Sequence, residues 1–146
     1  MGDAGSLEQL VDDLTYLDEW EDRYRYIIEL GKELTPLIDA DKNDSTKVKG
    51  CVSQVWLKSS LESFDPPRLV FQGESDAHIV NGLIAILLRL FNHKSPDEIL
   101  VIDAQSLFHK IGLDAHLSPQ RSNGLVAMVN RIHHDASHIA ETSTAT

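Results

Sequence analysis

Hydrophobic and polar positions follow a helical rhythm over much of the chain, and this rhythm is clearest between Asp18 and Gly31. In this segment apolar side chains recur at the three- and four-residue spacing of one helix face, at Trp20, Tyr24, Ile27 and Ile28. Gly31 occupies a position typical of a helix end, and Pro36 follows shortly after it. We therefore predict a helix over Asp18–Gly31.

The middle of the chain has the pattern of a β-hairpin. A polar surface loop is expected over residues 39–47, and residues 52–61 then place apolar side chains among serine and glutamine. Residues 69–71 form a second short apolar run that ends at Gly73. The sequence Asp65-Pro66-Pro67 separates the two runs, since proline interrupts a strand ladder. We predict two antiparallel strands joined across this proline turn.

The next predicted element is the centre of the fold. Ser75 and Asp76 are expected to cap a helix over residues 77–92, because serine and aspartate side chains accept hydrogen bonds from the first unpaired backbone amides of a helix. Apolar residues lie on nearly every face of this helix, which is typical of a buried element. We expect the other elements to surround it.

Three shorter signals complete the predicted fold. Ser95-Pro96-Asp97-Glu98 has the pattern of a capping box with proline at the first helical position. A further helix is expected over residues 104–111, ended by Gly112, and the last helix is expected to begin at Ser118-Pro119. About five helices and a small antiparallel sheet define an α+β domain.

The length of the chain fits one domain over residues 1–146. We expect its core at about residues 17–135 and flexible tails at residues 1–6 and 137–146, where small and polar side chains predominate. The longest purely aliphatic run, Leu83–Leu88, has six residues, whereas a membrane-spanning helix needs about 20. We therefore expect no membrane span, no secretory signal and a cytoplasmic location.

The charge of the chain narrows the choice of partners. Its 13 basic and 23 acidic residues give a formal net charge of −10 with neutral histidine. Such a surface repels nucleic-acid phosphates and anionic lipid, which argues against nucleic acid and membranes as partners. A partner protein with a basic patch is compatible with this charge. The lack of an evident exposed apolar stripe in the sequence favours a monomer.

Cys51 is the chain's one cysteine, so neither an internal disulfide nor a cysteine-built zinc site is expected. It follows Gly50 where the polar loop gives way to the first strand, and glycine permits close approach by another molecule. Lys49 is expected to favour the thiolate, which is the nucleophilic form. The alternative is a buried structural thiol, because free cysteine is among the most buried residue types.

Two charged residues near predicted helix starts are further candidates. Asp76 lies in the first turn of the central helix, where a carboxylate complements the helix dipole. Arg121 lies in the first turn of the last helix, where its charge is mildly unfavourable to the dipole. Such a cation is expected either to pair with a carboxylate or hold a partner, or to be an ordinary solvated side chain.

The histidines offer one arrangement similar to a metal site, formed by His134 and His138 with His133 adjacent. Two imidazoles four residues apart can share a helix face, but a site needs a third ligand, and the sequence has no His-Glu-x-x-His pattern. We therefore expect no metal. The sequence also lacks a glycine-rich phosphate loop and a Gly-x-Ser-x-Gly elbow, which argues against a nucleotide enzyme or a serine hydrolase.

Four segments together form a specific combination. They are Trp20–Leu34 (WEDRYRYIIELGKEL), Gly50–Leu57 (GCVSQVWL), Ser75–Ala85 (SDAHIVNGLIA) and Leu117–Leu125 (LSPQRSNGL). In this order and spacing the chain resembles the SufE family of cysteine-desulfuration proteins, over about residues 17–135. Each motif alone is modest, whereas four in register are specific.

The resemblance implies a compact α+β fold and a function in sulfur transfer. A pyridoxal-phosphate cysteine desulfurase, SufS-like or CsdA-like, would transfer sulfane sulfur to this protein and be stimulated by it. The sulfur would then pass to an iron–sulfur cluster scaffold, and this chain itself would need no cofactor. Cys51 matches the family's acceptor position. Roles in partner binding or support of the acceptor loop are implied for Gly50, Ser53, Gln54, Asp76, Arg121 and Asn123.

The chemistry of persulfide exchange needs one accessible cysteine and no second thiol. We expect the Cys51 loop to shelter the bound sulfur against the apolar hairpin and to swing out when a partner docks. Serine in place of Cys51 is expected to abolish sulfur acceptance while leaving the fold nearly intact. A large loss of stability would instead indicate a buried structural thiol.

Two other classes of function remain open from the residues themselves. A stand-alone thiol enzyme predicts turnover without a partner and a basic residue beside Cys51. A passive acidic interaction domain predicts that Cys51 in the native protein resists alkylating reagents. Rapid alkylation would exclude the interaction domain but would not separate the other two classes.

Overall fold

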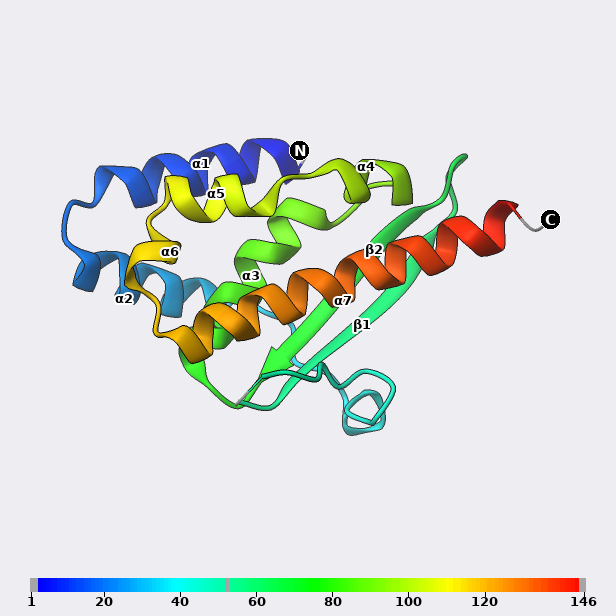
Figure 1. Ribbon diagram of the computed structural model, residues 1–146, viewed down its shortest axis with the longest axis horizontal. Helices are drawn as coiled ribbons and strands as arrows, with labels where there is room; N and C mark the ends of the chain where they lie inside the picture. The colour runs from blue at the N-terminus through cyan, green and yellow to red at the C-terminus, as the bar shows by residue number, and fades with distance from the viewer. Residues whose placement is uncertain (1–2, 52, 145–146) are drawn as a thin grey trace.

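The computed structural model describes residues 3–51 and 53–144 and shows a single α+β unit (Figure 1). Within this part of the chain there are seven α-helices, one short 3-10 helix and two strands. In chain order these are α1 (Asp3–Tyr16), α2 (Trp20–Gly31), η1 (Asp39–Asp41), β1 (Val55–Glu62), β2 (Arg68–Ser75), α3 (His78–Phe91), α4 (Pro96–Val101), α5 (Ala104–Lys110), α6 (Leu113–His116) and α7 (Pro119–Thr144). The predicted fold class is confirmed.

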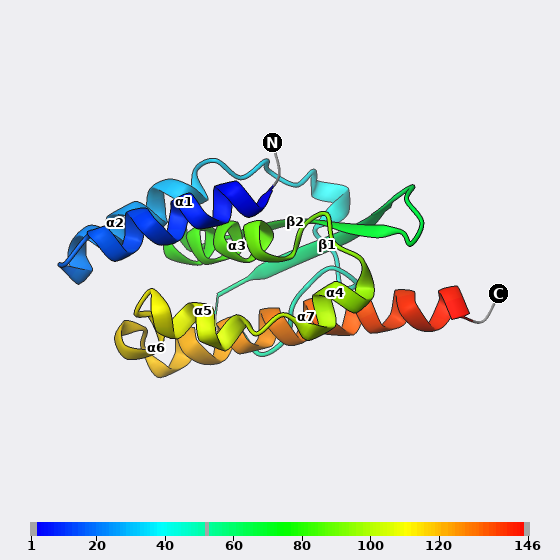
Figure 2. The same ribbon diagram turned by 90° about the horizontal axis from the view of Figure 1, so that it is seen from above.

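Helix α3 lies between two groups of elements. Figure 2 shows α1 and α2 on one side of it and the group α5, α6 and α7 on the other. Contacts join α3 to α1, α2, β2 and α7, so it is the element that the others share. This confirms the prediction that the helix with apolar residues on nearly every face is the centre of the fold.

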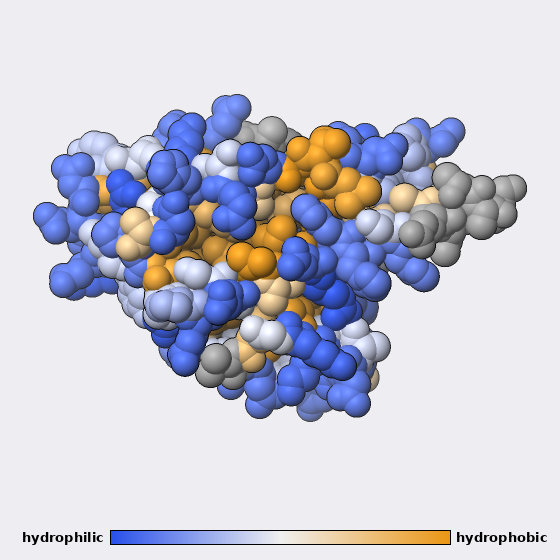
Figure 3. Space-filling model, in the orientation of Figure 1, coloured by the Kyte–Doolittle hydropathy of each residue, from blue (hydrophilic) through white to orange (hydrophobic). Residues whose placement is uncertain are grey.

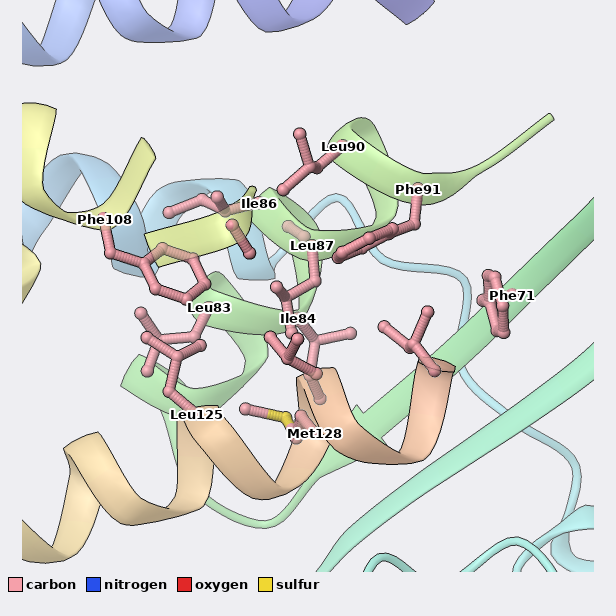
Figure 4. Packing of buried hydrophobic residues seen from close by; sticks show 14 of the residues in the cluster. Phe71, Leu83, Ile84, Ile86, Leu87, Leu90, Phe91, Phe108, Leu125 and Met128 are labelled. Carbon is pink, nitrogen blue, oxygen red and sulfur yellow. The ribbon is translucent and has the colours of Figure 1, made fainter. Parts of the chain in front are cut away.

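The hydrophobic core is built around the side chains of α3. Ile84, Leu87 and Phe91 have almost no exposed surface. Figure 4 shows side chains from β2, α5 and α7 converging on this helix, namely Phe71, Phe108, Leu125 and Met128. Each such buried side chain contributes roughly 1.5–3 kcal/mol to the free energy of folding. Helix α7, which carries part of the candidate site, is therefore fixed to the core by its apolar face.

Helices α2 and α3 pack closely together because glycine residues lie where they touch. A Cβ atom at Gly82 would lie 2.1 Å from the carbonyl oxygen of Ile27, and one at Gly31 would lie 2.6 Å from the backbone nitrogen of Gly82. Both distances are too short for any side chain. Gly82 therefore stands in the interior of a helix because its neighbour's backbone occupies the space of a side chain.

The two strands form the predicted antiparallel hairpin, with Val55 opposite Ser75 and Glu62 opposite Arg68. Side chains of β2 alternate between the core and the surface, as expected for a sheet with one covered face. The strand continues past Gly73, its expected end, to Ser75. Glycine suits this position because the Cβ atom of any larger residue would lie only 2.7 Å from the side chain of Leu57.

Helical structure reaches into both segments expected to be tails. Helix α1 begins at Asp3, and its residues Leu10 and Leu14 are fully buried, so the core begins well before residue 17. Helix α7 continues to Thr144, and Ile139 packs against the core. Apolar residues at helical spacing pack on neighbouring helices at both ends, and this packing outweighs the weak local preference for helix. The short helix α6 was also not predicted from the sequence.

Exposed apolar side chains gather on one face of the molecule. On the face in Figure 3, hydrophobic residues form a band surrounded by hydrophilic ones, over the region where α4, α5 and α7 meet. Leu100 and Val101 of α4 and Val126 of α7 are exposed. No such apolar stripe was evident in the sequence, because exposure depends on which helices meet. Among the described helices, none is both long and apolar enough to cross a membrane.

Candidate functional site

The loop that carries Cys51 begins where the backbone of Val48 is hydrogen-bonded to the first residue of β1. The amide of Val48 donates a hydrogen bond of 2.8 Å to the carbonyl oxygen of Val55, and this bond closes the loop at its base. Gly50 adopts a φ of 92°, a left-handed conformation that L-residues with side chains rarely adopt. This glycine turns the chain so that Cys51 faces helix α7. The predicted role of Gly50 in the backbone of the loop therefore has a geometric basis.

The sulfur of Cys51 lies in a cavity of about 330 Å³. The thiol is half-buried, and its Sγ atom lies 3.7 Å from the carbonyl oxygen of Gly124, to which it donates a hydrogen bond. The apolar part of the lining comes from β1, α3 and α7 and consists of Val55, Val80, Leu83, Leu125 and Met128. The polar part consists of Ser53, Ser118, Gln120 and Arg121.

The cavity wall differs from the expected one. We expected the apolar hairpin to shelter the sulfur, but of the described lining residues other than Cys51 only Ser53 and Val55 belong to β1 or the loop before it. Helices α3 and α7 provide the rest of the apolar surface. The reason is that the hairpin turns its apolar face toward α3, while the loop before the start of β1 reaches α7.

Burial raises the pKa of the Cys51 thiol above its ordinary value. The expectation that Lys49 favours the thiolate is therefore wrong for this conformation. Lys49 is exposed and lines a separate shallow groove with Ala127 and Asn130, so its charge does not offset the desolvation of the sulfur. In the resting loop Cys51 is a neutral thiol at neutral pH, and its conversion to the nucleophilic form requires a change in its surroundings.

Asp76 holds the far end of the Cys51 loop. Its Oδ1 atom accepts a hydrogen bond of 3.0 Å from the amide of Gln54, and its own amide donates one of 3.3 Å to the carbonyl oxygen of Gln54. The expectation that Ser75 and Asp76 cap α3 is wrong, since the N-cap residue is Ala77 and no side chain caps the helix. The carboxylate of Asp76 turns to the loop, where an unpaired amide is available.

Arg121 is exposed in the first turn of α7 and lines the cavity that holds Cys51. Its amide donates a hydrogen bond to Ser118 Oγ, which helps to start the helix. The structure thus brings Cys51, Ser53 and Arg121 to one cavity. Asn123 is exposed on α7 and is not among the described residues of the lining.

Several lining residues were not singled out from the sequence. The most informative is Gly124, whose carbonyl oxygen accepts from the thiol and whose missing side chain leaves space beside the sulfur. A Cβ atom at this position would lie 3.6 Å from Cys51 Sγ. The helical spacing of Gln120, Gly124 and Met128 could have indicated a common face, but nothing in the sequence showed that this face meets Cys51.

Two adjacent histidines of α7 lie in different surroundings. The His133 ring is half-buried and packs edge-on against Phe91, with 5.9 Å between ring centroids, whereas His134 is exposed. Among the described residues, no group of three histidine, cysteine, aspartate or glutamate side chains is placed to hold a metal ion.

The fold and the site together describe one class of protein, a small α+β domain that carries one cysteine on a loop over a cavity with an apolar wall. The sequence model of the SufE family, described as an Fe–S metabolism associated domain, matches residues 8–136. The chain belongs to the SufE family, and this family is associated with iron–sulfur metabolism. The resemblance seen in the sequence is therefore confirmed.

Known relatives and a solved structure agree with this assignment. An uncharacterized SufE-like protein of Rhizobium meliloti is 53% identical over 132 residues, which cover 90% of this chain and 94% of the relative. One of Rhizobium etli is 53% identical over 133 residues, which cover 90% of this chain and 89% of the relative. The solution structure of a hypothetical protein from Thermus thermophilus has a TM-score of 0.73 at 18% identity, covers 92% of this chain and 96% of its own, and shows the same fold.

Proposed function

We propose that this protein is a sulfur acceptor that takes sulfane sulfur from a pyridoxal-phosphate cysteine desulfurase onto Cys51, stimulates that enzyme and passes the sulfur to an iron–sulfur cluster scaffold. The observation that carries the proposal is the position of Cys51. Its sulfur lies on a loop, half-buried over a cavity with room for a second sulfur atom. The SufE family assignment supplies the metabolic context.

The transfer balances without an added oxidant or reductant. The thiolate of Cys51 attacks the outer sulfur of a persulfide on the desulfurase, and a new S–S bond forms as the donor's S–S bond breaks. The donor cysteine leaves as a thiolate, and the proton lost from Cys51 is returned to it. A second exchange of the same kind passes the outer sulfur onward. One cysteine in this chain is sufficient for both steps.

The lining of the cavity favours an acceptor over a stand-alone thiol enzyme. A thiol enzyme needs a base beside its nucleophile, and the described lining residues include no histidine and no carboxylate. Burial also raises the pKa of Cys51, so the resting thiol is a poor nucleophile. We propose that docking of the desulfurase moves the loop outward, where the thiol regains its ordinary acidity and meets the donor persulfide.

Asp76 and Arg121 are assigned supporting roles in this proposal. The hydrogen bonds between Asp76 and Gln54 hold one end of the loop, so Asp76 influences how easily Cys51 is exposed. Arg121 is exposed at the mouth of the cavity and is suited to contact the partner or an anionic persulfide. Gly50, Ser53 and Asn123 are assigned to loop support or partner binding. We propose further that the protein acts in the cytoplasm as a monomer.

The test is intact-protein mass spectrometry after incubation with a cysteine desulfurase and free cysteine. The expected result is a gain of one sulfur atom that a reducing agent removes and that is absent from Cys51→Ser. The serine variant is also the stability control, and we expect its melting temperature to be nearly unchanged. No gain with desulfurases of both the SufS and CsdA types, while Cys51 remains alkylatable, would contradict the proposal.

The loop movement has its own test. We expect hydrogen exchange of backbone amides around Gly50 to change when the desulfurase is added, because docking draws the loop away from α7. Exchange in α3 serves as the internal control, since its amides lie in the centre of the fold. Unchanged exchange at the loop in a complex that forms would contradict the movement.

A further inference from the structure

Arg131 joins helix α7 to the segment that precedes the Cys51 loop. Its Nη1 atom donates a hydrogen bond of 3.1 Å to the carbonyl oxygen of Lys47, and its Nη2 atom donates one to the carbonyl oxygen of Ser45. Its Nε atom donates a hydrogen bond of 3.1 Å to Asp135 Oδ1, one turn further along α7. Three nitrogen atoms of one guanidinium thus donate hydrogen bonds to acceptors on two separate parts of the chain.

The pair formed by Arg131 and Asp135 is held in a fixed geometry. The two side chains are only 23% and 13% exposed, so their interaction is less screened than that of a surface ion pair. A guanidinium is planar and presents its donors in fixed directions, which suits the carbonyl oxygens of Ser45 and Lys47. Asp135 orients the guanidinium, and the guanidinium in turn fixes the backbone at Ser45 and Lys47.

The contact lies on the same face of α7 as the cavity. Gly124 meets the thiol of Cys51, Ala127 lies beneath Gly50, and Arg131 holds Lys47. These three residues of α7 are spaced by three and four positions, which is the spacing of one helix face. The chain before and within the loop therefore lies along this face, with Arg131 at one end and Gly124 at the other.

The backbone next to Arg131 is also tied to β1. Lys47 forms an isolated bridge with Trp56, and the amide of Val48 donates to the carbonyl oxygen of Val55. At the other end, Gln54 is held by Asp76. Gly50 and Cys51 lie between these two ties. The root of the loop at Lys47 is thus held to β1 by backbone pairing and to α7 by Arg131.

We propose that Arg131 is a positioning residue for Cys51. It fixes the root of the loop on α7, so that the thiol reaches Gly124 and the cavity. The purpose of the loop movement rests on the proposed sulfur transfer, but the positioning itself does not. Without the guanidinium, the loop lifts from α7 more often and Cys51 is exposed for a larger fraction of the time.

The test measures the rate at which iodoacetamide alkylates Cys51 in the native protein as a function of pH. For Arg131→Gln we expect alkylation at neutral pH to be at least about fivefold faster, because losing one charge-assisted hydrogen bond shifts an opening equilibrium by roughly that factor or more. The pH midpoint is expected to fall toward that of an ordinary thiol. Arg121 is the charged residue among the described lining of the Cys51 cavity, and it remains in the variant.

Two variants separate positioning from general destabilisation. Arg131→Lys keeps the charge but cannot serve all three partners, and we expect its alkylation rate to lie between those of the wild type and Arg131→Gln. Arg25→Gln is the matched control, because Arg25 has an exposed ion pair with Asp22 on α2, and we expect its alkylation to equal the wild type. Circular dichroism and the melting temperature establish that each protein is folded.

A further variant covers the case in which Arg131→Gln does not fold. Arg131→Met combined with Asp135→Leu removes both charges of the pair, so no half-buried carboxylate is left without its partner. The same increase in alkylation rate and the same lower midpoint are expected. Folded Arg131 variants with the rate and pH profile of the wild type would overturn the inference.

The alkylation test of Arg131 uses no desulfurase, so its result does not depend on the proposed sulfur transfer. If no sulfur is accepted by the wild type, the proposed function fails, while the dependence of alkylation on Arg131 still tests positioning. If sulfur is accepted but alkylation does not depend on Arg131, the proposed function stands and the positioning role fails.

Discussion

The thiol of Cys51 donates a hydrogen bond to the carbonyl oxygen of Gly124, with 3.7 Å between the sulfur and the oxygen. Only the protonated thiol can make this bond, since a thiolate has no proton to donate and is repelled by the carbonyl dipole. Burial disfavours the thiolate as well. The contact therefore couples the position of the loop to the protonation of its cysteine.

The first prediction concerns the pH dependence of Cys51. Because burial raises the pKa of this thiol, alkylation by iodoacetamide is expected to have its pH midpoint above the ordinary value of about 8.5. The protein unfolded in urea is the control and should show the ordinary midpoint. A native midpoint at or below the unfolded one would contradict the resting geometry.

The same shift has a consequence for stability. The folded-state pKa of Cys51 is raised, so its contribution to stability is fully present below the unfolded-state pKa and is lost as the pH rises through the folded-state pKa. We expect Cys51→Ser to show a weaker loss of unfolding free energy at alkaline pH than the wild type. Urea unfolding at neutral and alkaline pH measures this difference.

Local patterns were sufficient for most of the fold. The apolar surface of α3, the proline-separated strands and the capping box at Ser95 each depend on neighbours within a few residues, and each was predicted correctly. These features need no knowledge of distant parts of the chain.

The site depends on distant contacts, and there the sequence was less informative. The pKa of Cys51 is raised by burial against Gly124, which is 73 residues away in the chain. The neighbouring Lys49 had suggested the opposite, a lowered thiol pKa. Asp76 was expected to cap its own helix, but an amide from another part of the chain takes its carboxylate. Such partners become visible only when the elements are packed together.

A second prediction concerns Gly124. A Cβ atom here would be in ordinary contact with Cys51 Sγ, at 3.6 Å, so Gly124→Ala is expected to fold. Alanine in place of glycine inside a helix raises the unfolding free energy by about 0.5–1 kcal/mol. The added methyl group also narrows the space beside the sulfur, and we expect slower gain of sulfur in the desulfurase assay. Urea unfolding and intact mass measure the two effects.

Gly82 provides the contrast for this variant. A Cβ atom at Gly82 would lie 2.1 Å from the carbonyl oxygen of Ile27, so Gly82→Ala forces α2 and α3 apart. We expect a loss of roughly 3 kcal/mol or more of unfolding free energy, at the upper end of the usual cost of overpacking. If both glycine variants gained stability, the close approach of these helices would be refuted.

A third prediction separates charge from hydrogen bonding at Asp76. Asp76→Ala removes the acceptor for the amide of Gln54, and we expect a loss of about 1 kcal/mol in local stability with faster hydrogen exchange at Gln54. Asp76→Asn keeps an acceptor oxygen without the charge and should exchange nearly as slowly as the wild type. Equal exchange in the alanine variant and the wild type would show that the contact does not hold the loop.

The last prediction concerns the support of the segment that leads from α2 to the site. Glu74 on β2 accepts a hydrogen bond of 2.9 Å from the amide of Leu37, and its other oxygen lies 2.6 Å from Lys42 Nζ. The hydrogen bond from Lys42 holds the pKa of Glu74 below its ordinary value. The contribution of Glu74 to stability is therefore present above the unfolded-state pKa and is lost as the pH falls through the folded-state pKa.

Glu74→Gln tests this relationship. We expect the variant to have a lower unfolding free energy than the wild type at pH 7 and a difference that shrinks as the pH falls below the folded-state pKa of Glu74, where the wild-type carboxyl is also neutral. Glu29→Gln is the matched control, because Glu29 forms an exposed ion pair with Lys32 that is largely screened by solvent. A difference between Glu74→Gln and the wild type that stays constant throughout the acid range in which the folded protein persists would mean that the hydrogen-bond geometry, and not the charge of Glu74, fixes this segment.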